Sequence, residues 1–296
     1  MTLEPVVKWS GSKRSQAAEI VRRFPREIDT YYEPFCGGAS VLRRLLMTPS
    51  VKVRRYVCSD KNWDLIGLWN EIKFAPDWLS ERYAILWSNL NQDDDLDRKK
   101  KFFNDVREEF NEIRNSDLFL FIMRTTTNGM PRYNARGDFN NSFHVTRNGI
   151  DPKSMSRIIH DWSVALNYHN VEFFNRPYDD IAMRPKEGDF VYNDPPYHAV
   201  HGHSMYDGGI DTKRFFEWLR SLKCKWALSF DGKAGGEDLT YEVPEDLYVR
   251  HEYLASGNSS FRRVIGKNRH AEVYESLYLN YAADVREVER TQLELL

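Results

Sequence analysis

The spacing of hydrophobic and polar positions divides the chain into three parts, the first of which alternates helix-like and strand-like segments. Helical spacing over residues 15–24 and 40–47 alternates with short runs typical of strands at residues 31–35 and 53–59. A glycine-rich turn follows the first of these strands, and Asp60 follows the second. A strand, a turn, a helix and a second strand predict a βαβ unit with parallel strands.

The middle part is charged and its spacing is helical. Residues 75–115 are rich in charge, and residues 93–115 repeat apolar side chains at the spacing of an amphipathic helix with a solvated outer face. Three consecutive aspartates at residues 93–95 suit the N-terminus of such a helix. Residues 124–149 are too polar for a core and too long for a simple connection, so we expect a functional loop or hairpin there.

The last part returns to strands. Strand-like runs at residues 189–193, 226–230 and 275–281 flank a helical segment at residues 212–222. The whole pattern predicts an α/β fold whose sheet-forming domain is split by an inserted, mostly helical segment. The predicted parts are a catalytic domain in two pieces, residues 1–75 and 166–296, and an inserted domain, residues 76–165.

Composition and charge exclude several classes of protein. Hydrophobic residues make up 41% of the 296 residues and charged residues 29%, which excludes a disordered or collagen-like chain. A formal net charge of -2 excludes a generally basic nucleic-acid coat, although a local basic patch is compatible with it. Aromatic residues reach 14%, more than an average core needs, and surplus rings often line interfaces or pockets.

The sequence predicts neither a membrane nor a secretory location. The apolar run at residues 118–123 is far shorter than the roughly 20 residues that span a bilayer, and the first residues lack the basic and apolar regions of a signal peptide. Cys36, Cys58 and Cys224 are far apart and form no CxxC pair, which disfavours a disulfide framework and a cysteine-rich zinc site. We therefore expect a cytoplasmic protein that binds no membrane.

The turn after the first strand has the residues of a ligand-binding loop. Gly37 and Gly38 let the backbone turn sharply before a helix and approach a ligand closely. Asp60 stands at the end of the next strand, where a carboxylate can accept hydrogen bonds from ribose hydroxyls. The combination fits an adenosine-containing ligand, although a glycine pair at such a turn is often purely structural. The turn is not a GxGxxG motif, which disfavours the alternative of a nucleotide-binding oxidoreductase.

The most informative motif is the segment Asp194-Pro195-Pro196-Tyr197, directly after a predicted strand. Two prolines make a stiff turn, so an acidic acceptor, a fixed carbonyl and an aromatic ring lie within four residues. The Asp194 side chain and the Pro195 carbonyl can each accept one N–H of an exocyclic amino group, which frees the lone pair of its nitrogen, while Tyr197 stacks on the base. The alternative is a rigid loop with its ring packed on proline.

A short N-terminal segment, KWSGSK at residues 8–13, carries charge and a ring near a predicted helix. Lysine supplies a point charge for a carboxylate, and Trp9 can wall a pocket or face a positively charged sulfur centre. The alternative is that these residues simply cap the helix that follows.

The polar insert is locally basic. Four arginines and one acid, Asp138, lie between residues 122 and 150, which is a local net charge of +3 in a chain of net charge -2. Arginine and asparagine pair with guanine and adenine edges, and interleaved rings such as Tyr133 and Phe139 can stack or wedge. The alternative is a solvated, arginine-rich hairpin. The arginines are Arg124, Arg132, Arg136 and Arg147.

Three histidines, His198, His201 and His203, follow the proline turn in an HxxHxH pattern. A metal site is conceivable there, but no neighbouring cysteine or carboxylate cluster supports one. We expect a loop near the pocket and no metal.

The order of these motifs resembles that of the α-group of S-adenosylmethionine-dependent DNA adenine-N6 methyltransferases, the Dam-like family. The resemblance covers residues 8 to about 281. It implies a Rossmann-like class I methyltransferase sheet with an inserted, mostly helical target-recognition domain that carries a hairpin. The segments that resemble family motifs are KWSGSK (8–13), EPFCGG (33–38), SDKN (59–62), RYNARGDFN (132–140) preceded by Asn128-Gly129, and DPPY (194–197).

The resemblance also implies roles for single residues. S-adenosyl-L-methionine would be the cofactor and double-stranded DNA the partner, with a cognate restriction enzyme as a further candidate partner and a monomer as the expected state. The implied catalytic residues are Asp194, Pro195, Pro196 and Tyr197. The implied cofactor-binding residues are Trp9, Lys13, Glu33, Phe35, Gly37, Asp60, Tyr178 and Asp194. The implied DNA-binding residues are Lys8, Asn128, Arg132, Asn134 and Arg136.

Three segments depart from the family pattern. Ala39 follows Gly37-Gly38 where the family usually has a glycine. Pro177 precedes Tyr178 where the family commonly has an acid, which puts one adenine contact in doubt. The segment FNNSFH at residues 139–144 replaces FNxPFG, which affects the recognised sequence more than the chemistry.

We therefore predict a site-specific DNA methyltransferase that acts on N6 of adenine in duplex DNA after the base is flipped out of the helix. The tyrosine of DPPY favours adenine over the alternative of cytosine N4, and the basic hairpin favours duplex DNA over RNA. A catalytically silent DNA-binding relative is a further alternative, which the intact DPPY and KWSGSK segments disfavour. The predicted setting is a prokaryotic cytoplasm or a phage-infected host.

Overall fold

Two compact units make up the chain. The computed structural model describes residues 2–127, 129, 131–180, 184–196, 210–234, 237–256 and 273–283. Unit 1 comprises Met1–Ser12, Cys36–Ser40 and Cys58–Pro177, and unit 2 comprises Lys13–Phe35, Val41–Val57 and Tyr178–Leu296.

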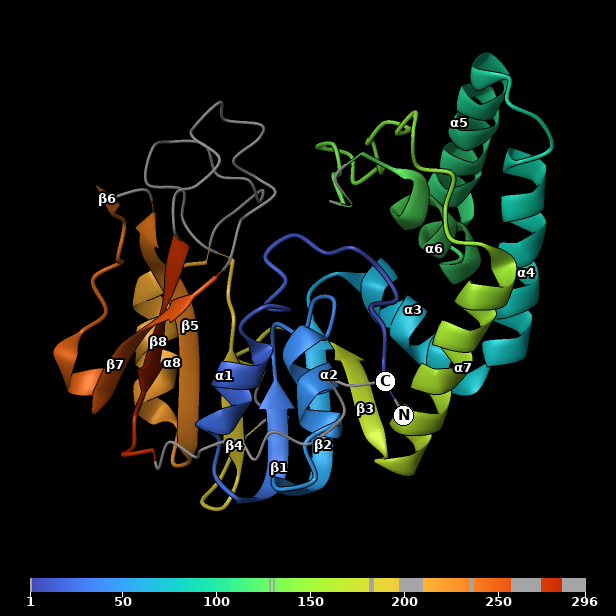
Figure 1. Ribbon diagram of the computed structural model, residues 1–296. Coiled ribbons are helices and arrows are strands. Elements are labelled where there is room, and N and C mark those ends of the chain that lie inside the picture. The colour runs from blue at the N-terminus through green and yellow to red at the C-terminus, as the bar shows by residue number, and fades with distance from the viewer. Residues whose placement is uncertain are drawn as a thin grey trace. The chain divides into compact units, whose positions relative to one another are not determined.

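The described strands form an eight-stranded sheet. Its order is β3-β2-β1-β4-β5-β8-β7, with β6 paired to β5 (Figure 1). The strands are β1 (Glu27–Glu33), β2 (Lys52–Asp60), β3 (Val171–Asn175), β4 (Phe190–Asn193), β5 (Lys225–Ala234), β6 (Glu237–Asp238), β7 (Arg250–Ala255) and β8 (Val273–Leu279). The predicted α/β class is confirmed, because helices alternate with strands and the central strands are parallel.

Most of unit 1 is helical. Its core joins α3, α7 and β3: Trp69 stacks on Phe173 at a centroid distance of 5.4 Å and lies 4.9 Å from Trp162. Asn62 caps α3 by accepting the Leu65 N–H. The helices are α3 (Trp63–Phe74), α4 (Pro76–Leu90), α5 (Leu96–Ile113), α6 (Ser116–Thr125) and α7 (Pro152–Tyr168).

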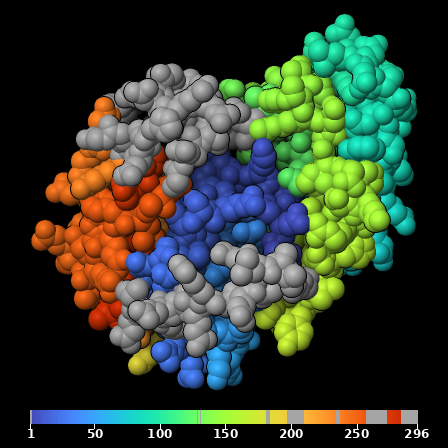
Figure 2. Space-filling view, viewed as in Figure 1, coloured from blue at the N-terminus to red at the C-terminus, as the bar shows by residue number. Residues whose placement is uncertain are grey.

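The predicted amphipathic helix is confirmed as α5. Asp95 caps it by accepting the N–H groups of Asp97 and Arg98, and the buried Phe103 and Phe110 lie on its inner face. Charged residues of its outer face such as Lys101 and Asp105 are exposed, and this part of the chain lies at the surface in teal (Figure 2). The pattern thus predicted the helix from spacing alone, as expected for a long periodic segment.

Unit 2 contains parallel and antiparallel strands, and both faces of its central strand are covered. β1 and β4 are parallel, with Tyr31 opposite Phe190, and β4 and β5 are parallel. β8 is antiparallel to both β5 and β7, so β7 and β8 form a hairpin at this end of the sheet order. All four residues of β4 are buried, as in a strand covered on both faces.

Helices cover both faces of the β4 region. Phe24, next to α1 (Ala17–Arg22), contacts Phe190 at 4.5 Å, whereas Val191 packs in a cluster with Phe215 of α8 (Thr212–Ser221). Neighbouring residues of a strand point to opposite faces, so α1 and α8 lie on opposite sides. The remaining helices of unit 2 are α2 (Ser40–Leu46), which begins in unit 1, and the 3-10 helix η1 (Glu245–Leu247).

Several predicted boundaries differ from the structure. The first strand begins at Glu27 rather than at residue 31 and ends at Glu33, because Pro34 cannot continue the ladder. Residues 131–149 contain no regular strand but close into a hairpin through antiparallel bridges such as Tyr133 with Phe139. The domain limits at residues 75 and 165 fall inside unit 1 and stay predictions.

No helix in the described part of the chain combines the length and the apolar character that crossing a bilayer requires.

Candidate active site

A glycine turn in unit 1 lies directly against Trp9. Gly37 has a φ of +46°, and a Cβ atom there would stand 2.8 Å from Nε1 of Trp9. A Cβ atom at Gly38 would stand 2.8 Å from Cβ of Trp9. A side chain at either position would collide with the tryptophan, and the left-handed backbone at Gly37 also favours glycine. Packing of the Trp9 ring therefore requires glycine in this turn. A second tryptophan, Trp69, donates from Nε1 to the Gly37 carbonyl at 3.1 Å.

Ala39 keeps the backbone conformation of a glycine. Its φ is +53°, in the left-handed region, and its side chain is fully buried. The Ala39 N–H donates to the Cys36 carbonyl at 2.7 Å and closes the turn. The departure from the family's glycine pattern thus keeps the shape of the turn, against a conformational cost of about 1–2 kcal/mol for an L-residue.

Asp60, the last residue of β2, uses one carboxylate oxygen to bind the glycine turn and the other to bind the start of α3. Oδ2 accepts the Gly37 N–H at 3.0 Å, and Oδ1 accepts the Asn62 N–H at 2.9 Å. Burial raises the pKa of Asp60, although these N–H donors act in the opposite direction. Each oxygen keeps a further lone pair, so the carboxylate can still accept a hydrogen bond from a hydroxyl. Unit 1 therefore brings together three residues predicted to bind the cofactor: Trp9, Gly37 and Asp60.

In unit 2, two acidic residues stand where the strand order changes direction. Glu33 ends β1, and Asp194 follows β4, which pairs with β1 in parallel. From β1 the order runs to β2 on one side and to β4 on the other. Ligands of open α/β sheets bind beyond the carboxyl ends of the strands at such a switch point. The topology therefore places both carboxyl groups at a binding position.

A buried lysine holds the Asp194 carboxylate. Lys13 Nζ lies 2.7 Å from Asp194 Oδ1 and 3.2 Å from Glu275 Oε2, and the Lys13 side chain is 3% exposed, against 18% and 22% for the two acids. Burial alone would lower the pKa of Lys13, but the charges of Asp194 and Glu275 outweigh it and the pKa is raised. Lys13 is therefore an ammonium at neutral pH, and its charge favours the ionised form of the carboxyl group it faces.

Glu33 is in the opposite charge state. Its side chain is buried, and burial raises the pKa of Glu33 to about 8; the Tyr31 hydroxyl, which donates to Oε2 at 2.8 Å, acts against this shift, and the charge of Asp194 adds to it. At neutral pH Glu33 is therefore mostly protonated. Two carboxyl groups of one switch point thus differ in function, because Asp194 only accepts hydrogen bonds and Glu33 can donate one.

Two predicted cofactor residues of unit 2 meet as a pair of rings. Phe35 stacks on Tyr178 at a centroid distance of 5.5 Å, and Trp218 contacts Tyr178 edge-on at 5.1 Å. Both Phe35 and Tyr178 are partly exposed, so the pair offers an apolar wall to a ligand. Pro177, next to Tyr178, supplies no carboxylate, so this segment offers a ligand only an apolar face.

The hairpin of the polar insert turns its rings inward. Phe139 is 1% exposed and packs on Phe110 of α5, and the Tyr133 hydroxyl donates to Asp64 Oδ2 at 2.7 Å. Both rings fix the hairpin to the helices of unit 1, and Phe139 is buried, so stacking of Tyr133 or Phe139 on DNA stays a prediction that would require the hairpin to rearrange.

Asn134 uses both ends of its amide to shape the hairpin tip. Oδ1 accepts the N–H groups of Arg136 and Asp138 at 2.9 and 3.0 Å, and Nδ2 donates to Asp138 Oδ2 at 3.0 Å. Base reading by Asn134 would require this turn to open. Arg132 and Arg136 are exposed, and Arg136 Nε lies 3.2 Å from Asp138 Oδ2.

Lys8 lies beside the start of the hairpin. A Cβ atom at Gly129 would stand 2.5 Å from Cβ of Lys8. Burial lowers the pKa of Lys8, and the charges of Arg147 and Arg124 lower it further. Three cations therefore lie within electrostatic reach of one another in unit 1, although Arg124 is largely buried and Arg147 donates to the Thr126 carbonyl. The predicted residues that lie outside the described part of the chain are Asn128, Tyr197, His198, His201 and His203.

Sequence reasoning missed Glu275 altogether. The available signal was an acid inside a strand whose following residues, Ser276 and Leu277, are buried. Within the described ranges, no group of three or more His, Cys, Asp or Glu side chains could hold a metal ion.

Comparison with known proteins finds a matching family, related sequences and an alignable solved structure. A sequence model of D12 class N6 adenine-specific DNA methyltransferases matches residues 9–253. The chain is 26% identical over 305 residues to the type II methyltransferase M.MjaIII of Methanocaldococcus jannaschii, covering 95% of this chain and 100% of that protein. It is 30% identical over 196 residues to the DNA adenine methylase of Escherichia coli (strain K12), covering 64% of each chain. A solved structure, the rRNA methyltransferase aviRa from Streptomyces viridochromogenes, aligns with a TM-score of 0.39 at 12% identity over 94% of this chain and 85% of that chain.

Proposed function

Because this chain belongs to the D12 class N6 adenine-specific DNA methyltransferase family, we propose that Asp194 and the carbonyl of Pro195 accept the two N–H groups of the target adenine's N6 during methyl transfer. The observation that carries this proposal is the buried ion pair of Asp194 with Lys13 at 2.7 Å. An ionised carboxylate accepts hydrogen bonds and donates none, so the ion pair fixes the hydrogen-bonding direction of Asp194.

Two acceptors on one amino group also account for its reactivity. The N6 lone pair of adenine is delocalised into the ring, and hydrogen bonds from both N–H groups favour a tetrahedral nitrogen with a localised lone pair. Pro195 and Pro196 restrict their own backbone, so the Pro195 carbonyl keeps its direction. Alignment of the nitrogen with the methyl carbon then supplies much of the rate.

The residues present fit S-adenosyl-L-methionine, which when bound supplies a methyl group on a positively charged sulfur. Asp60 retains acceptor capacity for ribose hydroxyls, and Trp9 and Gly37 shape the turn beside it. In unit 2 the acids outnumber the lysine, which suits a cationic ligand, and Phe35 with Tyr178 offers the apolar wall. We assign Lys13 to Asp194 rather than to direct contact with the cofactor.

The DNA contacts are proposed on the basic side of unit 1. Arg132, Arg136 and Lys8 would contact phosphates or bases of duplex DNA, and the target adenine must leave the helix to be methylated. Asn128 remains a proposed contact from the resemblance alone. M.MjaIII is named a type II methyltransferase, and by this similarity a restriction enzyme of the same specificity is the proposed partner of a monomeric methyltransferase.

The test measures transfer of a radiolabelled methyl group to duplex DNA by the full chain and by Asp194→Asn. We expect a loss of at least about 100-fold in kcat, because the amide donates as well as accepts and no longer pairs with Lys13. The matched control is Asp246→Asn, which removes an exposed acid that pairs with Arg220 in the same unit and should leave transfer unchanged. Full activity of Asp194→Asn would contradict the proposal. Methylation of RNA or of cytosine by the wild type, with none of adenine in DNA, would redirect it to the alternative substrates.

A further inference from the structure

We propose that Glu275 is a positioning residue for Asp194, acting through Lys13; this rests on the role proposed above for Asp194. Glu275 lies on β8, beyond the part of the chain that the family model matches. Its Oε2 lies 3.2 Å from Lys13 Nζ, and its Oε1 accepts the Ser256 hydroxyl at 3.1 Å. A continuous chain of contacts thus runs from the end of β7 through Glu275 and Lys13 to the Asp194 carboxylate.

The strand opposite Glu275 is bulged at this level. Phe230 pairs with Ser276 and Lys233 with Tyr274, so two residues of β5, Asp231 and Gly232, stand opposite Glu275 alone. A Cβ atom at Gly232 would lie 2.8 Å from Glu275 Cα. Bulges of this kind re-aim a side chain locally. The sheet is therefore irregular at the position from which the Glu275 side chain projects.

The segment that carries Lys13 is attached to the same hairpin at further points. The Ser15 hydroxyl donates to the Ser256 carbonyl at 3.1 Å, and Gln16 Nε2 donates to the Leu254 carbonyl at 3.2 Å. These bonds hold the backbone beside Lys13 against the end of β7, and Glu275 then selects the direction of its ammonium.

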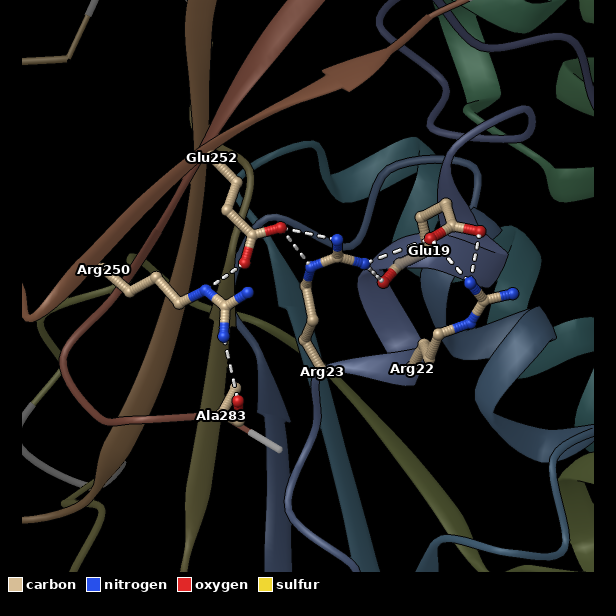
Figure 3. A network of polar contacts seen from close by, with 6 residues as sticks. All are labelled: Glu19, Arg22, Arg23, Arg250, Glu252 and Ala283. Carbon is tan, nitrogen blue, oxygen red and sulfur yellow. Dashed lines mark hydrogen bonds and ion pairs between the residues drawn. The ribbon is translucent and has the colours of Figure 1, made fainter. Parts of the chain in front are cut away.

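At the other end of α1, Arg23 completes the attachment. It donates to Glu252 of β7 through Nε at 2.8 Å and Nη2 at 2.5 Å, and to the Glu19 side chain through Nη1 (Figure 3). Glu252 also pairs with Arg250, which donates to the Ala283 carbonyl at 3.0 Å (Figure 3). This network fixes the helix to the hairpin without contacting Lys13 or Asp194, which makes it a suitable control.

A second carboxylate on the lysine has two effects on Asp194. The second carboxylate restricts the rotation of the ammonium's three N–H groups. It also offsets part of the positive charge that would otherwise polarise the Asp194 carboxylate. Lys13 pairs with Asp194, the charge of Asp194 acts on the buried Glu33 and Tyr192, and Glu275 pairs with Lys13. Removal of the Glu275 charge takes one of the two carboxylates from the Lys13 ammonium, so its positive charge acts more strongly on Asp194.

The experiment compares Glu275→Gln with Glu252→Gln in the full chain. We expect Glu275→Gln to lower kcat about 10–100-fold, as a misplacement of about 1 Å does, with the cofactor KM within about threefold of the wild type. The acidic limb of its pH–kcat profile should move to lower pH. Glu252→Gln should lower the urea midpoint without moving that limb.

Two outcomes would overturn the inference. One is a wild-type kcat and acidic limb in a folded Glu275→Gln; the other is the same kinetic change in both variants. If Glu275→Gln does not fold, Ser256→Ala decides, because it removes the hydroxyl that Oε1 accepts and keeps the charge, and unchanged kcat there overturns the proposal. The activity of Asp194→Asn separates the two proposals. If Asp194→Asn keeps its activity, the proposed function is refuted. If Asp194→Asn loses its activity while Glu275→Gln keeps wild-type kinetics, only the inference about Glu275 is refuted.

Discussion

Replacement of Lys13 by methionine is the perturbation that the structure makes most informative. The substitution keeps the length of the apolar stem and removes the one charge between Asp194 and Glu275. Loss of one partner of a buried ion pair costs about 3–5 kcal/mol, because the other charge stays buried. The two acids are 18% and 22% exposed and keep some solvation, so we expect the lower end, about 3 kcal/mol.

The assay is urea unfolding of Lys13→Met and wild type, followed by far-UV circular dichroism. With a urea m value of about 3 kcal/mol/M, the expected loss corresponds to a fall in midpoint of about 1 M. The matched control is Lys101→Met. Lys101 Nζ also lies 2.7 Å from a carboxylate oxygen, of Asp105, but these side chains are 75% and 54% exposed, so the midpoint should not change measurably.

The pH dependence gives the sign of the effect. In the wild type the pKa of Lys13 is raised, so its contribution is complete below pH 10.5 and is lost only as pH rises through the raised value. In Lys13→Met the ammonium no longer separates the carboxylates of Asp194 and Glu275, which repel each other when both are ionised. Protonation relieves the repulsion, so the deficit should be largest at pH 7 and smaller at pH 5. A deficit that is equal at both pH values, or no larger than in Lys101→Met, would refute the reasoning.

Three further outcomes follow from the described contacts. Glu33→Gln should raise the urea midpoint relative to wild type at pH 8 but not at pH 5. The pKa of Glu33 is raised to about 8, so the stability that its protonated form gives the folded wild type is lost as pH rises from 4.5 to 8. An equal difference at both pH values would contradict this. Gly37→Ala should cost at least about 1–2 kcal/mol of unfolding free energy from its φ of +46° alone, and displacement of Trp9 should change tryptophan fluorescence, so an unaltered spectrum would count against the packing described. Tyr133→Phe should cost about 0.5–1.5 kcal/mol, because it removes the 2.7 Å donor to Asp64 Oδ2 while Arg114 still donates to that oxygen at 3.3 Å. It should also weaken DNA binding with little change in cofactor affinity, as titrations of each would reveal.

Local sequence patterns were sufficient to predict much of the fold and part of the site. α5, α8 and β4 were predicted because each has a clear period or a buried apolar run. Asp194 was placed because it directly follows a strand, whereas Glu33 entered the site through the family resemblance. α7 was not predicted, although Asp151 before Pro152 is a helix-start signal. β3 and β7 were missed because short strands without strict alternation resemble loops.

The rest of the site depends on contacts between distant residues. Phe139 was assigned to DNA because a ring in a polar hairpin looks exposed, and only its packing on Phe110 of α5 shows otherwise. Asn134 was assigned to base reading, whereas the hydrogen bonds within its own turn occupy the amide. The role of Glu275 depends on its pairing with Lys13, and a single sequence does not encode which acid a buried lysine selects.

The attachment of the Lys13 segment to the β7–β8 hairpin also has a consequence for biosynthesis. Ser15 and Ser256, which meet there, are 241 residues apart in the chain. At about 5–20 residues per second, about 12–50 s pass between their translation. During that time the nascent chain carries Lys13 without the acid of β8 that later fixes it. The emergence of one late strand therefore sets the earliest moment at which a newly made molecule can become active, and ribosomes that stall before it release chains in which the arrangement around Lys13 is incomplete.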